Sequence, residues 1–307
     1  MMRHLLADDD LTPDEQAEVL DLAAAMKADP FGHRPLEGPR TVAMVFDRPT
    51  LRTQVSFSAG IAELGGHPMT VDGGLAGMGE RESVEDVARV LGRQAAAVVW
   101  RTAHQADLVL MAEHSGIPVV NALTDEFHPC QLLADLQTVR EHVGALSGTR
   151  VAFVGDGACN MGNSWVLAGA TAGMHVVVGA PDGYEPDADV VARAREIAGR
   201  TGGSVTLERD PVAAVTGAAV VVTDTWVSMG REEQRADRLR LFTPYALTGE
   251  LLAHADTGAI VMHCLPAYRG TEIDAAVIDG PRSVVWDEAE NRRHAQKAIL
   301  AWLLERA

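Results

Sequence analysis

Residues Val151–Asn160 read VAFVGDGACN and combine an apolar segment, a Gly-Asp-Gly turn and the beginning of a helix. Val151–Val154 has the length and composition of a buried β-strand. A short apolar strand that passes through a tight turn into a helix is typical of α/β proteins with parallel sheets. The same alternation recurs on both sides of this segment, so it predicts the fold class of the whole chain.

The alternation forms two series that meet near residue 145 of the 307-residue chain. Strands of the first series are expected at Thr41–Phe46, Pro68–Val71, Ala96–Trp100 and Pro118–Ala122. Strands of the second series are expected at Val151–Val154, His175–Gly179, Ser204–Leu207, Ala218–Thr223 and Ala259–His263. We therefore predict an α/β fold with two doubly wound parallel-sheet domains and the active site in the cleft between them. The predicted domains cover residues 1–143, completed by the C-terminal helix 288–307, and residues 144–287.

Composition narrows the classes of function. Acidic residues outnumber basic ones by 43 to 26, and the formal net charge is −17. An evenly acidic chain binds nucleic acid and anionic membranes poorly, so we expect neither as a partner. No apolar run reaches the roughly 18 residues that a membrane-spanning helix needs. The acidic first ten residues do not predict a signal peptide.

The few cysteines and lysines indicate the compartment and the way an anion would be bound. Cys130, Cys159 and Cys264 are an odd and sparse set, which argues against a disulfide framework and for a reducing, cytoplasmic compartment. Their spacing is not that of a zinc site. Lys27 and Lys297 are the only lysines, and neither follows a glycine as in a Walker-type phosphate loop. Any bound anion must therefore contact arginine.

Polar side chains follow three strands of the first series. Asp47–Thr53 (DRPTLRT) opens a helix, whose first N–H groups, together with Arg52, suit a phosphate. Arg101 ends a second strand, and His128 follows a third, just before Pro129. Each of these residues alone is equally well read as a surface or structural residue. Because carboxyl ends of parallel strands share one edge of a sheet, the three together predict one anion site.

The residues that follow the strands of the second series suggest other ligands than an anion. Asp224 could hold an ammonium group, although it could also cap a helix. Cys264 lies in His263–Pro266, where a buried cysteine is normally inert and a Cys–His nucleophile pair is the alternative. Gly155–Gly157 begins like a dinucleotide-binding turn, but the G-x-G-x-x-G spacing fails at Asn160. We expect no metal and no organic cofactor.

These segments, in this order, resemble the aspartate/ornithine carbamoyltransferase family over about Phe46 to Leu304. Four segments carry the resemblance: Phe127–Gln131, Thr223–Gly230, His263–Pro266 and Glu288–Arg292. Two of them, with Asp224 and with Cys264, look like the ornithine branch. The loop Gly73–Glu82 also lacks the lysine that aspartate-specific members use. The resemblance implies a homotrimer or an assembly of trimers, carbamoyl phosphate in the first domain and the amino acid in the second.

The resemblance also implies which residues bind each substrate. The expected carbamoyl-phosphate residues are Thr50, Leu51, Arg52, Thr53, Arg101, His128, Gln131 and Arg292. The expected ornithine residues are Asn160, Asp224, Ser228, Met229, Cys264 and Leu265. Among them, Arg101, His128 and Cys264 are expected to act on the reacting groups.

Two departures from the family pattern leave the substrate open. The usual Ser-Thr-Arg-Thr-Arg is here Thr50–Gln54 (TLRTQ), so Leu51 brings no hydroxyl and Gln54 no charge. The loop Gly73–Glu82 has no glutamine to lend to a neighbouring subunit, which makes it more apolar and more flexible. Relatives that carbamoylate N-acylated ornithine also carry a leucine at the place of Leu51.

The predicted reaction is carbamoyl transfer from carbamoyl phosphate to L-ornithine, which gives L-citrulline and phosphate in arginine biosynthesis. Within the same class, the acceptor could be another diamino acid or N-acylated ornithine. A catalytically silent binding relative and a nicotinamide dehydrogenase are the alternatives from other classes.

Overall fold

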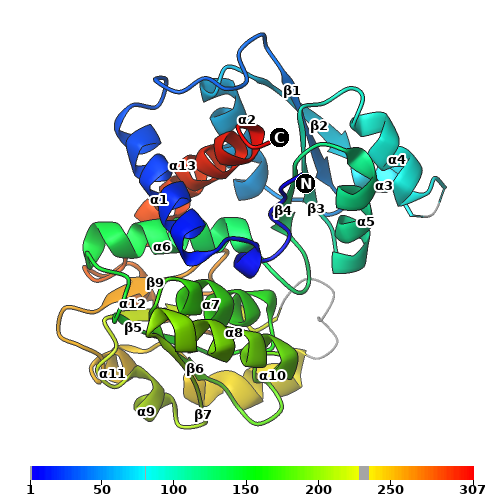
Figure 1. Ribbon diagram of the computed structural model, residues 1–307. Helices are drawn as coiled ribbons and strands as arrows, with labels where there is room; N and C mark the ends of the chain where they lie inside the picture. Colours follow the sequence, from blue (N-terminus) through cyan, green and yellow to red (C-terminus); the bar gives the residue numbers. More distant parts are fainter. Residues whose placement is uncertain (1, 80, 228–234) are drawn as a thin grey trace. The chain divides into compact units, whose positions relative to one another are not determined.

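The structure is a computed structural model that describes residues 2–79, 81–227 and 235–307. The chain divides into two compact units, one formed by Met1–Gln137 with Ala289–Ala307 and the other by Thr138–Glu288. Each unit contains one sheet in which all strand pairs are parallel (Figure 1). The predicted pair of parallel-sheet α/β domains is therefore confirmed. Across the described ranges, no helix has both the length and the apolar character that crossing a membrane requires.

The first unit has a four-stranded sheet in the order β2-β1-β3-β4. Its strands are β1 (Thr41–Phe46), β2 (His67–Asp72), β3 (Ala97–Arg101) and β4 (Val119–Leu123). The chain leaves β1 towards β2 on one side and continues with β3 on the other. The carboxyl ends of β1 and β3 therefore form a topological switch point, which is where ligands bind in open α/β sheets.

Helices cover both faces of this sheet. They are α1 (Pro13–Ala28), α2 (Arg52–Glu63), α3 (Gly73–Ala76), α4 (Val84–Leu91), α5 (Gln105–Ser115), α6 (Pro129–His142) and α13 (Val285–Leu304). Val45 and Trp100 pack with residues of α4 and α5 in one apolar cluster. Met44 and Val99, which alternate with them and point to the opposite face, are also fully buried. Burial on both faces explains why these strands are continuous apolar runs.

The second unit has a five-stranded sheet in the order β7-β6-β5-β8-β9. Its strands are β5 (Arg150–Val154), β6 (His175–Gly179), β7 (Ser204–Glu208), β8 (Val220–Thr223) and β9 (Ile260–Met262). Its helices are α7 (Asn160–Thr171), α8 (Ala188–Thr201), α9 (Pro211–Val215), α10 (Arg235–Phe242), α11 (Gly249–Leu252) and α12 (Ala275–Ile278). Figure 1 shows α7 and α8 side by side. Here the order reverses between β5 and β8, at the Gly155–Gly157 turn.

Two elements differ from the sequence-based expectation in kind or by more than two residues at one end. The final helix begins at Val285 rather than at residue 288. Its early start follows from tertiary pairing, because Val284 N–H donates to the Val261 carbonyl in β9 and α13 begins directly after this contact. The segment expected as a flexible loop after β2 contains one helical turn, Gly73–Ala76.

Candidate active site

The predicted anion-binding residues lie at the carboxyl edge of the first unit's sheet. Arg101 is the last residue of β3, and His128 lies between β4 and α6. The residues that follow β1 lead into α2, which begins at Arg52. The first N–H groups of a twelve-residue helix therefore lie at the same edge as both side chains.

Hydrogen bonds join these elements through Thr53. Arg292 of α13 donates from Nη1 to Gln131 Oε1 and from Nη2 to Thr53 Oγ1, each at 2.9 Å. Arg101 Nη1 donates to the same Thr53 oxygen at 3.4 Å. Thr53, Gln131 and Arg292 are all buried. Side chains from α2, β3, α6 and α13 thus form one cluster, and two of its members are guanidinium groups.

The cluster is strongly cationic around a neutral imidazole. Burial lowers the pKa of His128 well below its ordinary value, and the charges of Arg292, Arg101 and Arg52 lower it further. The neutral ring can donate one hydrogen bond without adding a charge. Three guanidinium groups close enough to act on one imidazole create a positive potential, which favours a small multiply charged anion.

The N-terminal turn of α2 is only partly lined by polar side chains. Thr50 and Arg52 are half-buried, whereas the Leu51 side chain is 72% exposed. Leu51 occupies the cap position of α2 and makes no side-chain capping hydrogen bond. Its contribution to anion binding is therefore limited to its backbone N–H.

The predicted amino-acid residues lie at the carboxyl edge of the second unit's sheet. Asn160 begins α7 after β5, Asp224 follows β8, and Cys264 and the half-buried Leu265 follow β9. Cys264 Sγ donates to Asp224 Oδ1 at 3.3 Å. Asp224 also acts electrostatically on Cys159, the residue before Asn160. Ser228 and Met229, expected here as well, lie outside the described residues.

The electrostatics of this edge suit a cation. Burial raises the pKa of Asp224, whereas His263 and the hydrogen bond from the Thr225 N–H lower it. The Thr225 N–H lies 2.7 Å from Asp224 Oδ1. Asp224 is half-buried, and a carboxylate partly removed from water gains from a paired positive charge, so an ammonium group beside it would stabilise its ionised form.

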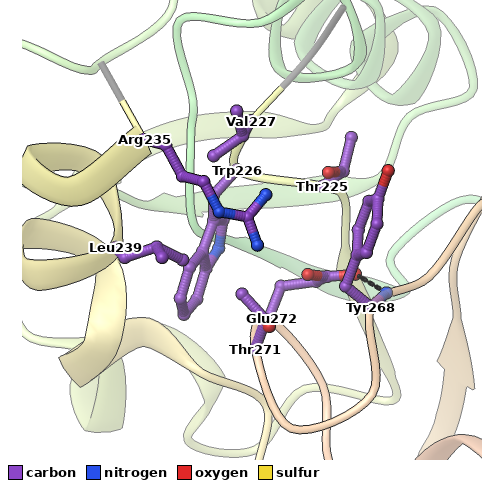
Figure 2. Close-up of a pocket in the computed structure, with 8 residues that line it drawn as sticks. All are labelled: Thr225, Trp226, Val227, Arg235, Leu239, Tyr268, Thr271 and Glu272. Carbon is purple, nitrogen blue, oxygen red and sulfur yellow. Dashed lines mark hydrogen bonds between the residues drawn. The ribbon is translucent and has the colours of Figure 1, made fainter. Parts of the chain in front are cut away.

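Two glutamates that the sequence analysis did not assign hold this edge in place. His263 Nδ1 accepts the Leu265 N–H at 2.9 Å, so its proton lies on Nε2 and is donated to Glu272 Oε1 at 3.3 Å. Glu272 also accepts the Tyr268 N–H, which Figure 2 shows as a dashed line. Glu288 of α13 accepts the His263 N–H at 2.9 Å. Glu272 has no motif spacing that could have revealed it, and Glu288 entered the sequence analysis only as the first residue of the segment Glu288–Arg292.

These contacts fix an unusual backbone turn. Leu265 has φ of 59°, a left-handed conformation that a branched side chain adopts only at a cost. The hydrogen bond from its N–H to His263 holds it there.

Asp224, His263 and Cys264 each offer a ligand atom within 4.8 Å of the others. Both ring nitrogens of His263 are already engaged, one by Leu265 N–H and the other by Glu272. A metal ion would have to displace one of these bonds, so we assign no metal to this group.

Figure 2 shows a small pocket whose lining includes Thr225, the residue after Asp224. It is lined by Thr225, Trp226, Val227, Arg235, Leu239, Tyr268, Thr271 and Glu272. None of the predicted substrate residues that the structure describes lines it. It is therefore distinct from the Asp224–Cys264 contact.

Comparisons with known proteins cover the whole chain. Residues 3–141 match the family model described as aspartate/ornithine carbamoyltransferase, carbamoyl-P binding domain. Residues 147–303 match the model described as aspartate/ornithine carbamoyltransferase, Asp/Orn binding domain.

Relatives and solved structures agree with the family models. The chain is 60% identical to an ornithine carbamoyltransferase of Clavibacter michiganensis over 100% of both chains. It is 58% identical to one of Mycolicibacterium paratuberculosis, over 99% of this chain and 98% of that one. The structure of the Pyrococcus furiosus ornithine carbamoyltransferase is similar with a TM-score of 0.95 and 42% identity, and covers 99% of this chain and 98% of that chain.

Proposed function

The chain belongs to the aspartate/ornithine carbamoyltransferase family, and we propose that it transfers the carbamoyl group of carbamoyl phosphate to the side-chain amine of L-ornithine, giving L-citrulline and phosphate. The observation that carries this proposal is the 60% identity, over the full length of both chains, to a relative named for that activity. The cationic cluster around His128 supplies the chemistry that the reaction needs on the phosphate side.

The first unit would bind carbamoyl phosphate. Thr50, the Leu51 N–H, Arg52 and Thr53 would hold the phosphate, since the beginning of α2 offers N–H groups and a guanidinium. Arg101, His128, Gln131 and Arg292 would bind the carbamoyl group. The hydrogen bonds from Arg101 and Arg292 to Thr53 support this division, because they hold both guanidinium groups beside the helix terminus.

The second unit would bind ornithine. Asp224 and Asn160, together with Ser228 and Met229, would hold the α-amino and α-carboxyl groups. Cys264 and Leu265 would lie beside the reacting amine. The thiol-to-carboxylate hydrogen bond at 3.3 Å supports the assignment, because it brings two of these residues together at one strand end.

The proposed reaction is a nucleophilic acyl transfer. The neutral amine of ornithine attacks the carbamoyl carbon, and a tetrahedral oxyanion forms. Collapse of the oxyanion breaks the bond between the carbamoyl carbon and the bridging phosphate oxygen. The proton that the attacking nitrogen loses passes to the departing phosphate. Arg101, Thr53 and neutral His128 would donate to the oxyanion, and each such donor is typically worth about 3 kcal/mol. Arg52 and the α2 terminus would stabilise the departing phosphate.

No step of this reaction needs a metal or an organic cofactor. The amine has a pKa of about 10.4 in water, so roughly 0.1% of it is neutral at pH 7.4. The site must therefore lower the pKa of the amine by removing water from it, or select the neutral form.

The proposal also includes the oligomeric state of the protein and its location in the cell. We infer a homotrimer, or an assembly of trimers, that acts in the cytoplasm in arginine biosynthesis. β2 lies at the edge of its sheet, with Met69 and Val71 only half-buried. Leu51 and Val55 are one turn apart on α2 and are 72% and 58% exposed. An edge strand and a pair of exposed apolar side chains in the same unit support contact with another copy of the chain.

The proposals of another acceptor amine are based on substitutions near the proposed phosphate site. Leu51 has replaced a hydroxyl, Gln54 a charge, and the loop after β2 carries glycines where a glutamine is usual in the family. A Cβ on Gly73 would lie 1.9 Å from an Asp47 carboxylate oxygen, so a side chain at this position would require the Asp47 side chain to move. These differences keep another diamino acid, N-acylated ornithine and a silent binding role as competing proposals.

A product assay separates the proposals. Carbamoyl phosphate is supplied with ornithine, with lysine, with 2,4-diaminobutyrate and with N-acetylornithine, and ureido product is measured. Highest kcat/KM with ornithine is expected. Higher kcat/KM with another amine would reassign the acceptor. Calorimetric binding of carbamoyl phosphate without product from any amine would identify a silent relative.

A further inference from the structure

A buried ion pair in the second unit connects the strand ends that carry the proposed amino-acid residues. Arg238 of α10 and Asp156 of the turn after β5 form this pair, and each side chain is 2% exposed. Arg238 Nε also donates to the Trp226 carbonyl. The second carboxylate oxygen of Asp156 accepts the Ala158 N–H at 3.2 Å. One guanidinium group therefore joins the segment after β8 to the turn after β5.

Aromatic rings enclose this guanidinium. The Arg238 group lies 5.2 Å from the centre of the Tyr184 ring and 5.0 Å from that of Phe242. The two rings meet edge to face, and Phe242 stacks on Trp226 with centroids 5.8 Å apart. Arginine suits such a place, because its planar group makes hydrogen bonds at its edge while its faces contact aromatic rings.

Two glycines let the joined segments approach closely. A Cβ on Gly155, whose φ is +126°, would lie 2.9 Å from Trp226 Nε1. A Cβ on Gly157 would lie 2.8 Å from the Tyr184 carbonyl oxygen. The turn that contains Asp156 therefore packs against both aromatic segments, and a shift of Arg238 would be passed to the turn and to Trp226 together.

We propose that Arg238 is a positioning residue for the amino-acid substrate, an inference that rests on the proposed function. Asp224 precedes Trp226 by two residues, and Asn160 follows Asp156 by four. The bonds from Arg238 to Trp226 and Asp156 set the separation of Asp224 and Asn160, while Arg238 itself touches no substrate atom. Misplacement by about 1 Å can cost an enzyme up to about a hundredfold in rate, so the effect is measurable.

Two variants test this role. Arg238→Lys keeps the charge but places a single ammonium where a fork serves two partners. Asp156→Asn/Arg238→Met removes both buried charges and keeps an acceptor for the Ala158 N–H. Replacing a buried ion pair by neutral side chains often leaves stability unchanged, so the double variant separates folding from positioning. Arg240→Lys is the matched control, because Arg240 lies on the same helix and is 84% exposed.

The readout is the KM for each substrate together with the thermal midpoint. In both test variants the KM for ornithine should rise about tenfold or more, while the KM for carbamoyl phosphate stays within about twofold. The double variant should keep a thermal midpoint near that of the parent, and Arg240→Lys should behave as the parent.

Two results would overturn the inference: an ornithine KM unchanged in Arg238→Lys, or equal increases in both KM values. If the double variant does not fold, Arg238→Lys decides by the same comparison. The parent protein is assayed first, and a parent that makes no citrulline would refute the proposed function instead.

Discussion

Thr53 contributes one oxygen atom, and the guanidinium groups of Arg101 and Arg292 both donate to it. The two positively charged guanidinium groups lie close together, and the shared acceptor stabilises them while no anion is bound. The hydroxyl can then turn its own proton towards the ligand. Thr53 thus accepts from both arginines, and under the proposed function it would also donate to the oxyanion.

Thr53→Val keeps the shape of the side chain and removes the acceptor. A hydrogen bond to a charged group contributes about 1.5–3 kcal/mol, so kcat/KM for carbamoyl phosphate should fall at least about tenfold. Steady-state citrulline formation measures it. Ser58→Ala, at a half-buried position on the same helix, should leave kcat/KM near the parent value. Parent-like kinetics in Thr53→Val would remove Thr53 from the site.

The pH profile should report the substrate rather than His128. Burial and three guanidinium groups hold the pKa of His128 well below 6.5, so the ring stays neutral near pH 7. The amine of ornithine, with a pKa of about 10.4, is still mostly protonated. The logarithm of kcat/KM for ornithine should therefore rise by about one per pH unit from pH 7 to 9.

His128→Asn is the variant that checks this assignment. It should lower kcat/KM at every pH and leave the slope unchanged. A wild-type profile that levels off above about pH 6.5, together with loss of that inflection in His128→Asn, would show that the ring titrates in the working range.

Helix α2 is the element on which the proposed phosphate site depends, and no side-chain hydrogen bond from Leu51 caps its first turn. Leu51→Thr restores a hydroxyl beside the first N–H groups. Because one added hydrogen bond to a charged ligand is worth about 1.5 kcal/mol or more, the KM for carbamoyl phosphate should fall several-fold. Ala62→Thr, at an exposed position near the other end of α2, is the control. Equal changes in the two variants would mean that the effect is not local to the helix terminus.

Sequence reasoning succeeds where an element is decided by its own residues. β1 and β6 have the predicted bounds, because each is a continuous apolar run. The capping box between Thr12 and Glu15 at the start of α1 is a further feature that depends on local residues alone. The sequence does not predict the bounds of an element when a tertiary contact determines them. α13 begins early because Val284 pairs with β9.

The site follows the same rule. Residues that end strands, such as Arg101 and Asp224, were identifiable because parallel strands align their carboxyl ends. Glu272 was not, because its role depends on a hydrogen bond to His263 that only the folded chain creates. The roles assigned to the site residues remain proposals.

For the whole molecule, the net charge of −17 contrasts with the cationic cluster in the first unit. Screening over about 8–10 Å at physiological salt leaves the distant acidic surface with little influence inside the site. Capture of an anionic substrate therefore depends on local arginines, and the reaction rate should be only modestly sensitive to moderate salt.

The proposed oligomeric state is also a property of the whole molecule, and its mass in solution tests it. Light scattering coupled to size exclusion should give three times the chain mass of 32.7 kDa, or a multiple of that trimer. Replacing the exposed pair by Leu51→Asp/Val55→Asp should shift the mass towards the monomer, because it places charge on an apolar contact surface. A parent protein with the monomer mass would contradict the proposed trimer.

The claim on which the account depends is that one site at the carboxyl edge of the first unit's sheet binds carbamoyl phosphate. A crystal structure with phosphonoacetamide, an unreactive analogue, tests it most directly. The account predicts phosphonate oxygens on the Thr50–Thr53 N–H groups and Arg52, with the amide oxygen in hydrogen-bond range of Arg101, Thr53 and His128. An analogue bound away from His128, with Arg101 and Arg292 making no contact to it, would contradict the account.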